Sequence, residues 1–154
     1  MIEFKSEVRD GMRIDWNVPL EMKDGVVLRC DIYRPDDDGK YPTILTYGIY
    51  AKGVPYQEGY PFHWNKMVED YPEILEMSTN KYQNWEVVDP ERWVPDGYVC
   101  IRVDSRGAGR SPGYLDPFSS RETKDFYELK KKKYLKNTLM EISQSLINKN
   151  RPEL

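Results

Sequence analysis

Histidine is almost absent from this chain, because His63 is the only one among its 154 residues. A serine hydrolase needs a general base that accepts the proton of its nucleophile, and a histidine usually provides it. His63 lies in the aromatic stretch PFHW, where a packing or hydrogen-bonding role is favoured over catalysis. With one histidine and two cysteines, the sequence also has no cluster typical of a zinc site.

Cysteine and long apolar runs are also scarce. Cys30 and Cys100 each lie inside an apolar run, which predicts two buried thiols rather than a disulfide or a metal pair. No stretch approaches the ~20 apolar residues of a membrane span, and the first residues, MIEFKSEVRDG, lack the apolar core of a secretory signal. The phosphate-binding motif G-x-x-x-x-G-K-[ST] is absent as well. We therefore expect a cytoplasmic protein with no membrane partner, no cofactor and no metal.

Positive charge is not in excess over the whole chain. The net charge is -3 and the pI is about 5.3, which gives no electrostatic reason to expect nucleic acid or an anionic membrane as a partner. Hydrophobic residues make up 39% and charged residues 32%, as in a globular domain. The acidic run at residues 36–38 could bind a hard cation, but a solvated turn is favoured.

Lysine is concentrated at one end of the chain. Residues 130–154 carry seven lysines and arginines against two acidic residues. Apolar residues recur there at helical spacing, namely Leu135, Leu139, Ile142 and Leu146. This pattern predicts a lysine-rich helical tail whose four-lysine run is a solvated helix face rather than a nucleic-acid site.

A hairpin is predicted near the start of residues 1–129. Two alternating runs flank Lys23-Asp24-Gly25, and Asp-Gly suits a two-residue turn. After this turn, the side chains of the second run alternate between an apolar set and a mixed set that includes Arg29 and Asp31. This alternation is typical of a half-buried antiparallel strand, with the apolar set facing the core.

Two further runs, residues 42–48 and 97–104, are apolar and rich in β-branched residues. They predict buried, parallel neighbours in an α/β sheet. The connection between them, residues 49–96, holds five of the eleven prolines and many aromatic residues, with a possible short helix at 64–68. A connection this long usually carries function or forms a cap. Ser119 and Glu122 predict a capping box for a helix that runs through residue 129.

The stretch GRSPG, residues 109–113, matches the G-x-S-x-G pattern around the nucleophile of many hydrolases. The residue after that nucleophile normally donates its N–H to the oxyanion hole, but here it is Pro112, which has none. Loss of one such donor typically lowers the rate on the order of 10²–10³-fold. The preceding strand is predicted to end at Asp104, too far away for a tight turn. Ser111 is therefore not expected to be a nucleophile.

Three blocks carry a resemblance to a known family: residues 18–53, residues 96–113 and the helix that ends in DFYEL. In this order they resemble the start of the catalytic domain of the cocaine-esterase-like, X-Pro dipeptidyl-peptidase-like α/β-hydrolases. The resemblance spans about residues 8–129. It implies a partial α/β-hydrolase fold, an N-terminal hairpin plus the early strands of a mostly parallel sheet, with a C-terminal helix and residues 49–96 as an insertion. The family hydrolyses acyl ester or peptide bonds.

In this family, the block that matches GRSPG is a loop after an early strand. The nucleophile elbow follows a later helix and strand, and the catalytic triad has no equivalent here. The chain continues instead into KKKKYLKN, which suggests a truncated hydrolase that is inactive alone, with a reading-frame change as one hypothesis for the tail. Two alternatives stay open: a non-enzymatic module that binds ligand through residues 49–96, and a subunit whose partner chain supplies the triad.

The resemblance also implies one functional residue. Family members place a tyrosine just after the strand that matches residues 42–48, with its hydroxyl in the oxyanion hole. The matching residue is Tyr50, and Tyr47 is the alternative if the alignment shifts. Because the family places this strand beside the elbow strand, we expect it to be an open edge here, prone to self-association.

Overall fold

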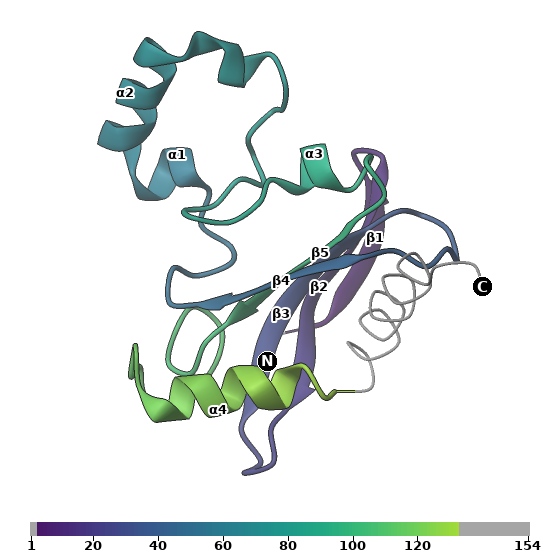
Figure 1. Ribbon diagram of the computed structural model, residues 1–154, viewed down its shortest axis with the longest axis vertical. Coiled ribbons are helices and arrows are strands. Elements are labelled where there is room, and N and C mark those ends of the chain that lie inside the picture. Colours follow the sequence, from purple (N-terminus) through teal and green to yellow (C-terminus); the bar gives the residue numbers. More distant parts are fainter. Residues whose placement is uncertain (1–2, 133–154) are drawn as a thin grey trace, which may run out of the picture.

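The computed structural model describes residues 3–132, so all but the first three residues of the helical tail predicted at residues 130–154 lie outside the described residues. Its centre is a five-stranded sheet with the order β1-β2-β3-β5-β4 (Figure 1). The strands are β1 (Lys5–Arg9), β2 (Met12–Glu21), β3 (Val27–Arg34), β4 (Thr43–Gly48) and β5 (Val99–Asp104). β4 and β5 are parallel, and the other neighbouring pairs are antiparallel. This mixed sheet confirms the partial α/β fold and the predicted parallel pair.

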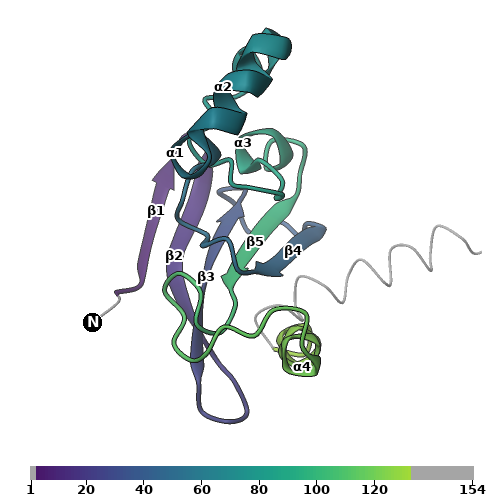
Figure 2. The ribbon, with the colours of Figure 1, turned by 90° about the vertical axis from the view of Figure 1, so that its left-hand side faces the viewer.

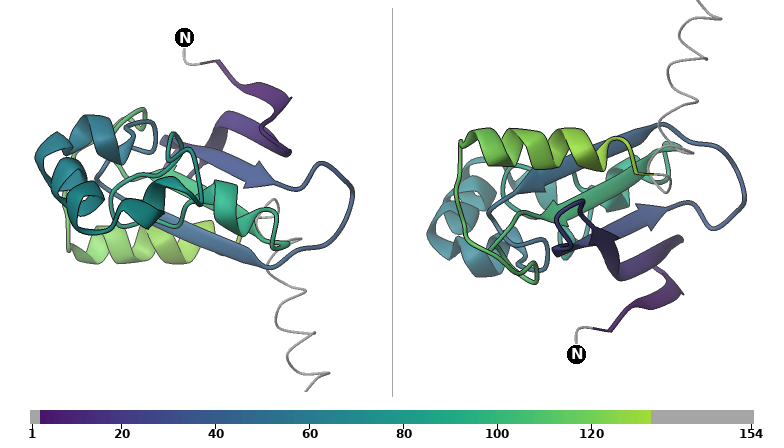
Figure 3. Two further views of the ribbon diagram at one scale, coloured as in Figure 1. Left: turned by 90° about the horizontal axis from the view of Figure 1, so that it is seen from above. Right: turned by 90° about the horizontal axis from the view of Figure 1, so that it is seen from below.

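Helices and loops cover both faces of this sheet (Figures 2 and 3). One face packs against α4 (Ser120–Leu129), through Leu129. The other face is covered by the long connection between β4 and β5. This connection contains α1 (Tyr56–Gly59), α2 (Pro61–Asp70), the 3-10 helix η1 (Pro72–Leu75) and α3 (Pro90–Trp93). None of the helices within residues 3–132 is long and apolar enough to cross a membrane.

Each face of the sheet has its own apolar cluster. The cluster on the α4 side includes Cys30, Ile101 and Leu129, and the cluster under the connection includes Cys100 and Tyr82. Both cysteines are buried and free, which confirms the prediction of two buried thiols, and burial raises the pKa of Cys100 to about 11. Since consecutive residues of β5 alternate between the two clusters, the whole strand is buried.

The second face of β3 is partly exposed at Val27 and Arg29, as the prediction of a half-buried strand requires, but the prediction is wrong for the rest of this face. Asp31 and Tyr33, which lie on this face, are almost completely inaccessible. The β4–β5 connection covers them and brings the ring of Tyr82 to 5.6 Å from the ring of Tyr33. Asp31 therefore faces a buried layer instead of solvent.

The hairpin turns also differ from the prediction. The loop between β2 and β3 holds three residues, 23–25, because the Met22 N–H donates to the Val26 carbonyl at 2.8 Å. Only Gly25 in this loop has a positive φ, whereas the predicted two-residue turn favours two. A two-residue turn does occur between β1 and β2, at Asp10-Gly11, where both φ angles are positive. This Asp-Gly pair was the signal for a hairpin that the sequence interpretation missed.

The predicted helices at residues 64–68 and up to residue 129 are confirmed by α2 and α4. Ser119 caps α4, since its hydroxyl accepts a hydrogen bond from the Glu122 N–H at 3.2 Å. The Glu122 carboxylate accepts from the Phe118 N–H at 2.7 Å, one residue earlier than a capping box requires. The start of α4 is thus fixed from both sides, and it lies beside the site described next.

Candidate functional site

A cleft of about 590 Å³ lies beside β4 and the turn that follows it. Its walls come from four parts of the chain: β4 and its turn, residues 84–87 of the long connection, residues 102–103 of β5, and α4 with the residues before it. Tyr50 lies in this wall and is 43% exposed. The side chains that line the cleft include Leu45, Tyr50, Trp85, Val87, Phe118 and Phe126.

Both tyrosines considered for the oxyanion hole line the cleft, but their hydroxyls lie in different surroundings. The Tyr47 hydroxyl donates a hydrogen bond to Asp125 of α4 at 3.3 Å, and burial raises the pKa of Tyr47 to about 12. The Tyr50 ring lies 6.5 Å from the ring of Trp85, and its hydroxyl has no hydrogen-bond partner among residues 3–132. Of the two hydroxyls, that of Tyr50 is therefore the one available to a ligand in the cleft.

The turn after β4 has an unusual backbone at Ala51, where φ is +55°. A residue other than glycine pays a conformational cost of order 1–3 kcal/mol in this left-handed region, so the surroundings must hold it there. Two donors do so: the Asn84 side-chain amide and the Val54 N–H each lie 3.1 Å from the Ala51 carbonyl oxygen.

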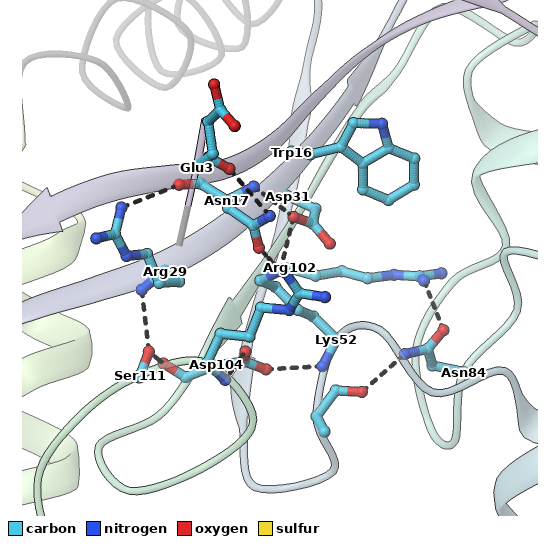
Figure 4. Close-up of polar contacts among 12 residues, drawn as sticks. Glu3, Trp16, Asn17, Arg29, Asp31, Lys52, Asn84, Arg102, Asp104 and Ser111 are labelled. Atoms are coloured by element: carbon cyan, nitrogen blue, oxygen red, sulfur yellow. Dashed lines mark hydrogen bonds and ion pairs between the residues drawn. The ribbon is translucent and has the colours of Figure 1, made fainter. Parts of the chain in front are cut away.

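Lys52 anchors the other side of the turn (Figure 4). Its Nζ lies 2.8 Å from Asp31 Oδ1, and the two side chains are only 4% and 1% exposed. Its backbone N–H donates to Asp104 Oδ1 at 2.7 Å. Burial raises the pKa of Asp31, and the Lys52 ammonium acts in the opposite direction. One lysine thereby ties the turn to both β3 and β5.

Asn17 completes this polar cluster from β2. It lies at a bulge between Asp15 and Val18, with φ at +56°. Its side-chain oxygen accepts from Lys52 Nζ at 2.8 Å, and its N–H donates to Asp31 Oδ1 at 2.8 Å. Because bulges redirect a strand locally, this one brings an amide to the buried ion pair.

Asp104, at the end of β5, organises the loop that contains the G-x-S-x-G pattern. Its second oxygen, Oδ2, accepts from the Arg110 N–H at 2.8 Å, so its carboxylate holds this loop and the turn at Lys52 together. Gly109 allows the close approach, because a Cβ there would lie 2.6 Å from Asp104 Oδ1. The glycine of the pattern is thus required by packing around a buried carboxylate.

Ser111 is a structural residue of this loop. It is 6% exposed, its hydroxyl donates to the Asp104 carbonyl at 2.7 Å, and it accepts from the Arg29 N–H at 2.9 Å. Both bonds join the loop to the sheet. His63 lies elsewhere, exposed on α2, with its ring 5.7 Å from the ring of Trp85.

We expect Ser111→Ala to lower the free energy of unfolding by roughly 1–3 kcal/mol, because it leaves a buried N–H and a buried carbonyl without their partner. Urea denaturation of the 154-residue chain measures this loss. Ser120→Ala, at an exposed position of α4, is the matched control and should change stability by less than about 0.5 kcal/mol. Equal, small effects of both variants would show that Ser111 does not hold the loop.

The side chain of Arg102, in β5, holds in place the wall of the cleft that residues 84–87 form. It is 3% exposed, and its guanidinium donates to Asn84 Oδ1 at 2.9 Å, to the Val88 carbonyl at 2.7 Å and to the Tyr82 carbonyl. Asn84 in turn donates to Ala51 in the turn. The wall and the turn are therefore held by one chain of hydrogen bonds that starts in β5.

The wall around Trp85 is aromatic. The rings of Tyr50, Tyr56, Tyr60 and His63 lie 6.5, 5.1, 4.6 and 5.7 Å from the ring of Trp85. Offset and edge-on ring contacts of this kind favour a rigid apolar surface. Such a wall suits an apolar or cyclic group of a ligand.

The acidic run at residues 36–38 lies away from the cleft lining. Asp36 pairs with Arg13, and Asp37 accepts from the Gly39 N–H at 2.7 Å and from the Tyr41 hydroxyl. These bonds hold the pKa of Asp37 below its usual range. Within the described part of the chain, no group of three or more histidine, cysteine, aspartate or glutamate side chains could hold a metal ion.

Comparison with known proteins adds to this geometry. Residues 24–130 match the family model of X-Pro dipeptidyl-peptidase (S15 family). A cocaine esterase from Rhodococcus sp. (strain MB1 Bresler) is 33% identical over 101 residues, which cover 66% of this chain. A crystal structure of a CocE/NonD family hydrolase from Staphylococcus aureus is similar at a TM-score of 0.64 and 30% identity over 84% of the chain. A second structure of a CocE/NonD family hydrolase from that organism gives a TM-score of 0.63.

These relatives are much longer proteins. The chain spans 13% of the length of the cocaine esterase and 23% of the two hydrolase chains. The region matched by the family model contains the cleft, the turn with Tyr50 and the ion pair of Lys52 with Asp31, whereas Asn17 lies just before it.

Proposed function

The chain belongs to the X-Pro dipeptidyl-peptidase (S15) family, and from this we propose that it forms the N-terminal part of the catalytic domain of a cytoplasmic serine hydrolase. In this proposal, the substrates are small-molecule esters or peptides, and the reaction is hydrolysis of an acyl ester or peptide bond. The nucleophile, its general base and the acid come from polypeptide other than residues 3–132. Alone, the 154-residue chain is inactive.

One observation carries this proposal: the Tyr50 hydroxyl lies at an apolar cleft on a turn that is fixed on both sides. Acyl transfer places negative charge on the carbonyl oxygen in the transition state. A donor that is already in place stabilises this charge without a reorganisation cost. Tyr50 is the donor that the turn presents to the cleft.

Hydrolysis assays on the 154-residue chain test the proposal. We expect no turnover of p-nitrophenyl esters or of proline-containing peptide p-nitroanilides above the uncatalysed rate, because a serine without a general base is a weak nucleophile. Ser111→Ala should give the same result. Turnover that disappears in this variant would overturn the proposal, because the nucleophile would then be Ser111.

The aromatic wall around Trp85 favours a second candidate function, a module that binds esters or peptides without cleaving them. In that case the chain alone should show saturable quenching of tryptophan fluorescence by an aromatic ester, and Trp85→Ala should remove it. Saturable binding in the complete absence of turnover by any longer form of the protein would favour this candidate over the hydrolase.

We also propose that the isolated chain associates with itself through β4. All six residues of β4 are partly exposed, and β5 is its single neighbour within the described sheet. An unpaired strand edge presents N–H and C=O groups to another chain. We expect oligomers in sedimentation velocity at micromolar concentration. A monodisperse monomer with a cooperative melt above ~60 °C would contradict this expectation.

A further inference from the structure

Burial of the ion pair between Lys52 and Asp31 is weak evidence that the pair stabilises the fold. Removing two charges from water costs so much that a buried pair is often no more stabilising than apolar residues of similar size. In this chain the two side chains are 4% and 1% exposed, at a separation of 2.8 Å. We therefore look for the role of this ion pair in the backbone geometry that it holds in place, rather than in its contribution to the free energy of unfolding.

That geometry concerns the turn after β4. Lys52 is two residues beyond Tyr50, and both its side chain and its backbone N–H form hydrogen bonds to the sheet (Figure 4). Its ammonium group reaches Asp31 of β3 and Asn17 of the β2 bulge, and its N–H reaches Asp104 of β5. The backbone and the side chain of Lys52 together therefore join the turn to three strands.

Ala51, which lies between Tyr50 and Lys52, connects the fixed lysine to the tyrosine. Ala51 has a left-handed backbone and is itself held by the Asn84 amide. Tyr50 is joined by a single peptide bond to Ala51. Because Ala51 and Lys52 are both held in place, the backbone of Tyr50 can move little. Through these hydrogen bonds, the sheet fixes the backbone from which the Tyr50 side chain extends.

We infer that Lys52, through its ion pair with Asp31, is a positioning residue for Tyr50. The inference rests on the proposed function, in which the Tyr50 hydroxyl stabilises the oxyanion. A misplacement of about 1 Å in a reacting group can lower a rate 10²-fold. An ammonium group with several directed bonds holds the turn more narrowly than an apolar side chain of the same length.

Hydrogen–deuterium exchange on the 154-residue chain tests this inference without any activity. The substitution Lys52→Met should raise the hydrogen-exchange rate of the backbone amides of residues 52 and 54 by roughly tenfold or more, because the turn then opens locally. The amides of β5 should keep their protection. Arg34→Met removes a different ion pair on the same sheet, with Asp15, and is the matched control that should leave the turn unchanged.

A double variant guards against a simple folding defect. Asp31→Leu combined with Lys52→Met removes both charges, so no unpaired charge is left buried and the chain should keep its cooperative unfolding transition. We expect this folded variant to exchange at the turn as fast as Lys52→Met alone. Native protection of the turn in the folded double variant would overturn the inference.

A form of the protein that contains the nucleophile adds a kinetic test. Lys52→Met should lower kcat about 10-fold or more with little change in KM, and it should have no further effect in a Tyr50→Phe background. If Tyr50→Phe lowers kcat and Lys52→Met does not, the inference is wrong and the proposed function stands. If Tyr50→Phe leaves kcat unchanged, Tyr50 is not the oxyanion donor and the inference that Lys52 positions it for catalysis is wrong, whatever the exchange data show of the turn.

Discussion

Replacing Tyr50 by phenylalanine, in a form of the protein that contains the nucleophile, is expected to lower kcat about 10²–10³-fold. The change removes one hydroxyl and leaves the ring, which packs near Trp85, in place. Because the lost hydrogen bond forms mainly to the transition state, KM should change little. Steady-state kinetics with an ester substrate, together with a circular dichroism spectrum to verify the fold, provide the measurement.

Tyr47→Phe is the matched control for this prediction. Its hydroxyl is bonded to Asp125 on the α4 side of the sheet, so its loss should lower stability slightly and leave kcat within a few-fold of the wild-type value. The reverse pattern, a large loss with Tyr47→Phe and none with Tyr50→Phe, would assign the oxyanion donor to Tyr47 and show that the alignment is shifted.

Replacing Arg102 by methionine is expected to unfold the chain or to come close to it. The guanidinium satisfies the carbonyls of Tyr82 and Val88 and the side-chain oxygen of Asn84, and it lies 5.2 Å from the ring centre of Tyr33. Three acceptors left buried without a donor cost roughly 3–9 kcal/mol together, at about 1–3 kcal/mol each. A whole domain is stable by only about 5–15 kcal/mol.

Urea denaturation followed by circular dichroism measures this loss. Arg121→Met, which changes an exposed arginine of α4, is the matched control and should shift stability by less than about 0.5 kcal/mol. A wild-type transition midpoint in Arg102→Met would mean that the long connection does not depend on β5 for its position.

The strands could be predicted from the sequence because their signals are local. Residues 42–48 and 97–104 are short apolar runs between breakers, and the structure pairs them as expected. The turn residues were harder to predict, since Asp-Gly occurs four times in the sequence and only Asp10-Gly11 forms a two-residue hairpin turn. Loop length depends on how the strands pair, and this pairing is set by packing as well as by the turn itself.

The buried polar cluster could not be predicted in this way. Asp31 lies in an alternating strand, where a carboxylate usually faces water, and its partner Lys52 is 21 residues away in a region without regular structure. The bulge that presents Asn17 has no clear local signal. Only the β4–β5 connection, which folds back over this face, converts these residues from exposed to buried. Tyr50 was predicted from the resemblance alone, and the cleft that it lines depends on the same long-range contacts.

The position of β5 between β3 and β4 has a consequence for folding during synthesis. β4 ends at Gly48, and β5, its partner, begins only at Val99. At a translation rate of about 5–20 residues per second, β4 leaves the ribosome roughly 3–10 s before β5 can pair with it. The hairpins of β1, β2 and β3 form from local contacts within microseconds of emerging. β4 therefore waits unpaired for seconds, and this interval is when a chaperone would bind the nascent chain.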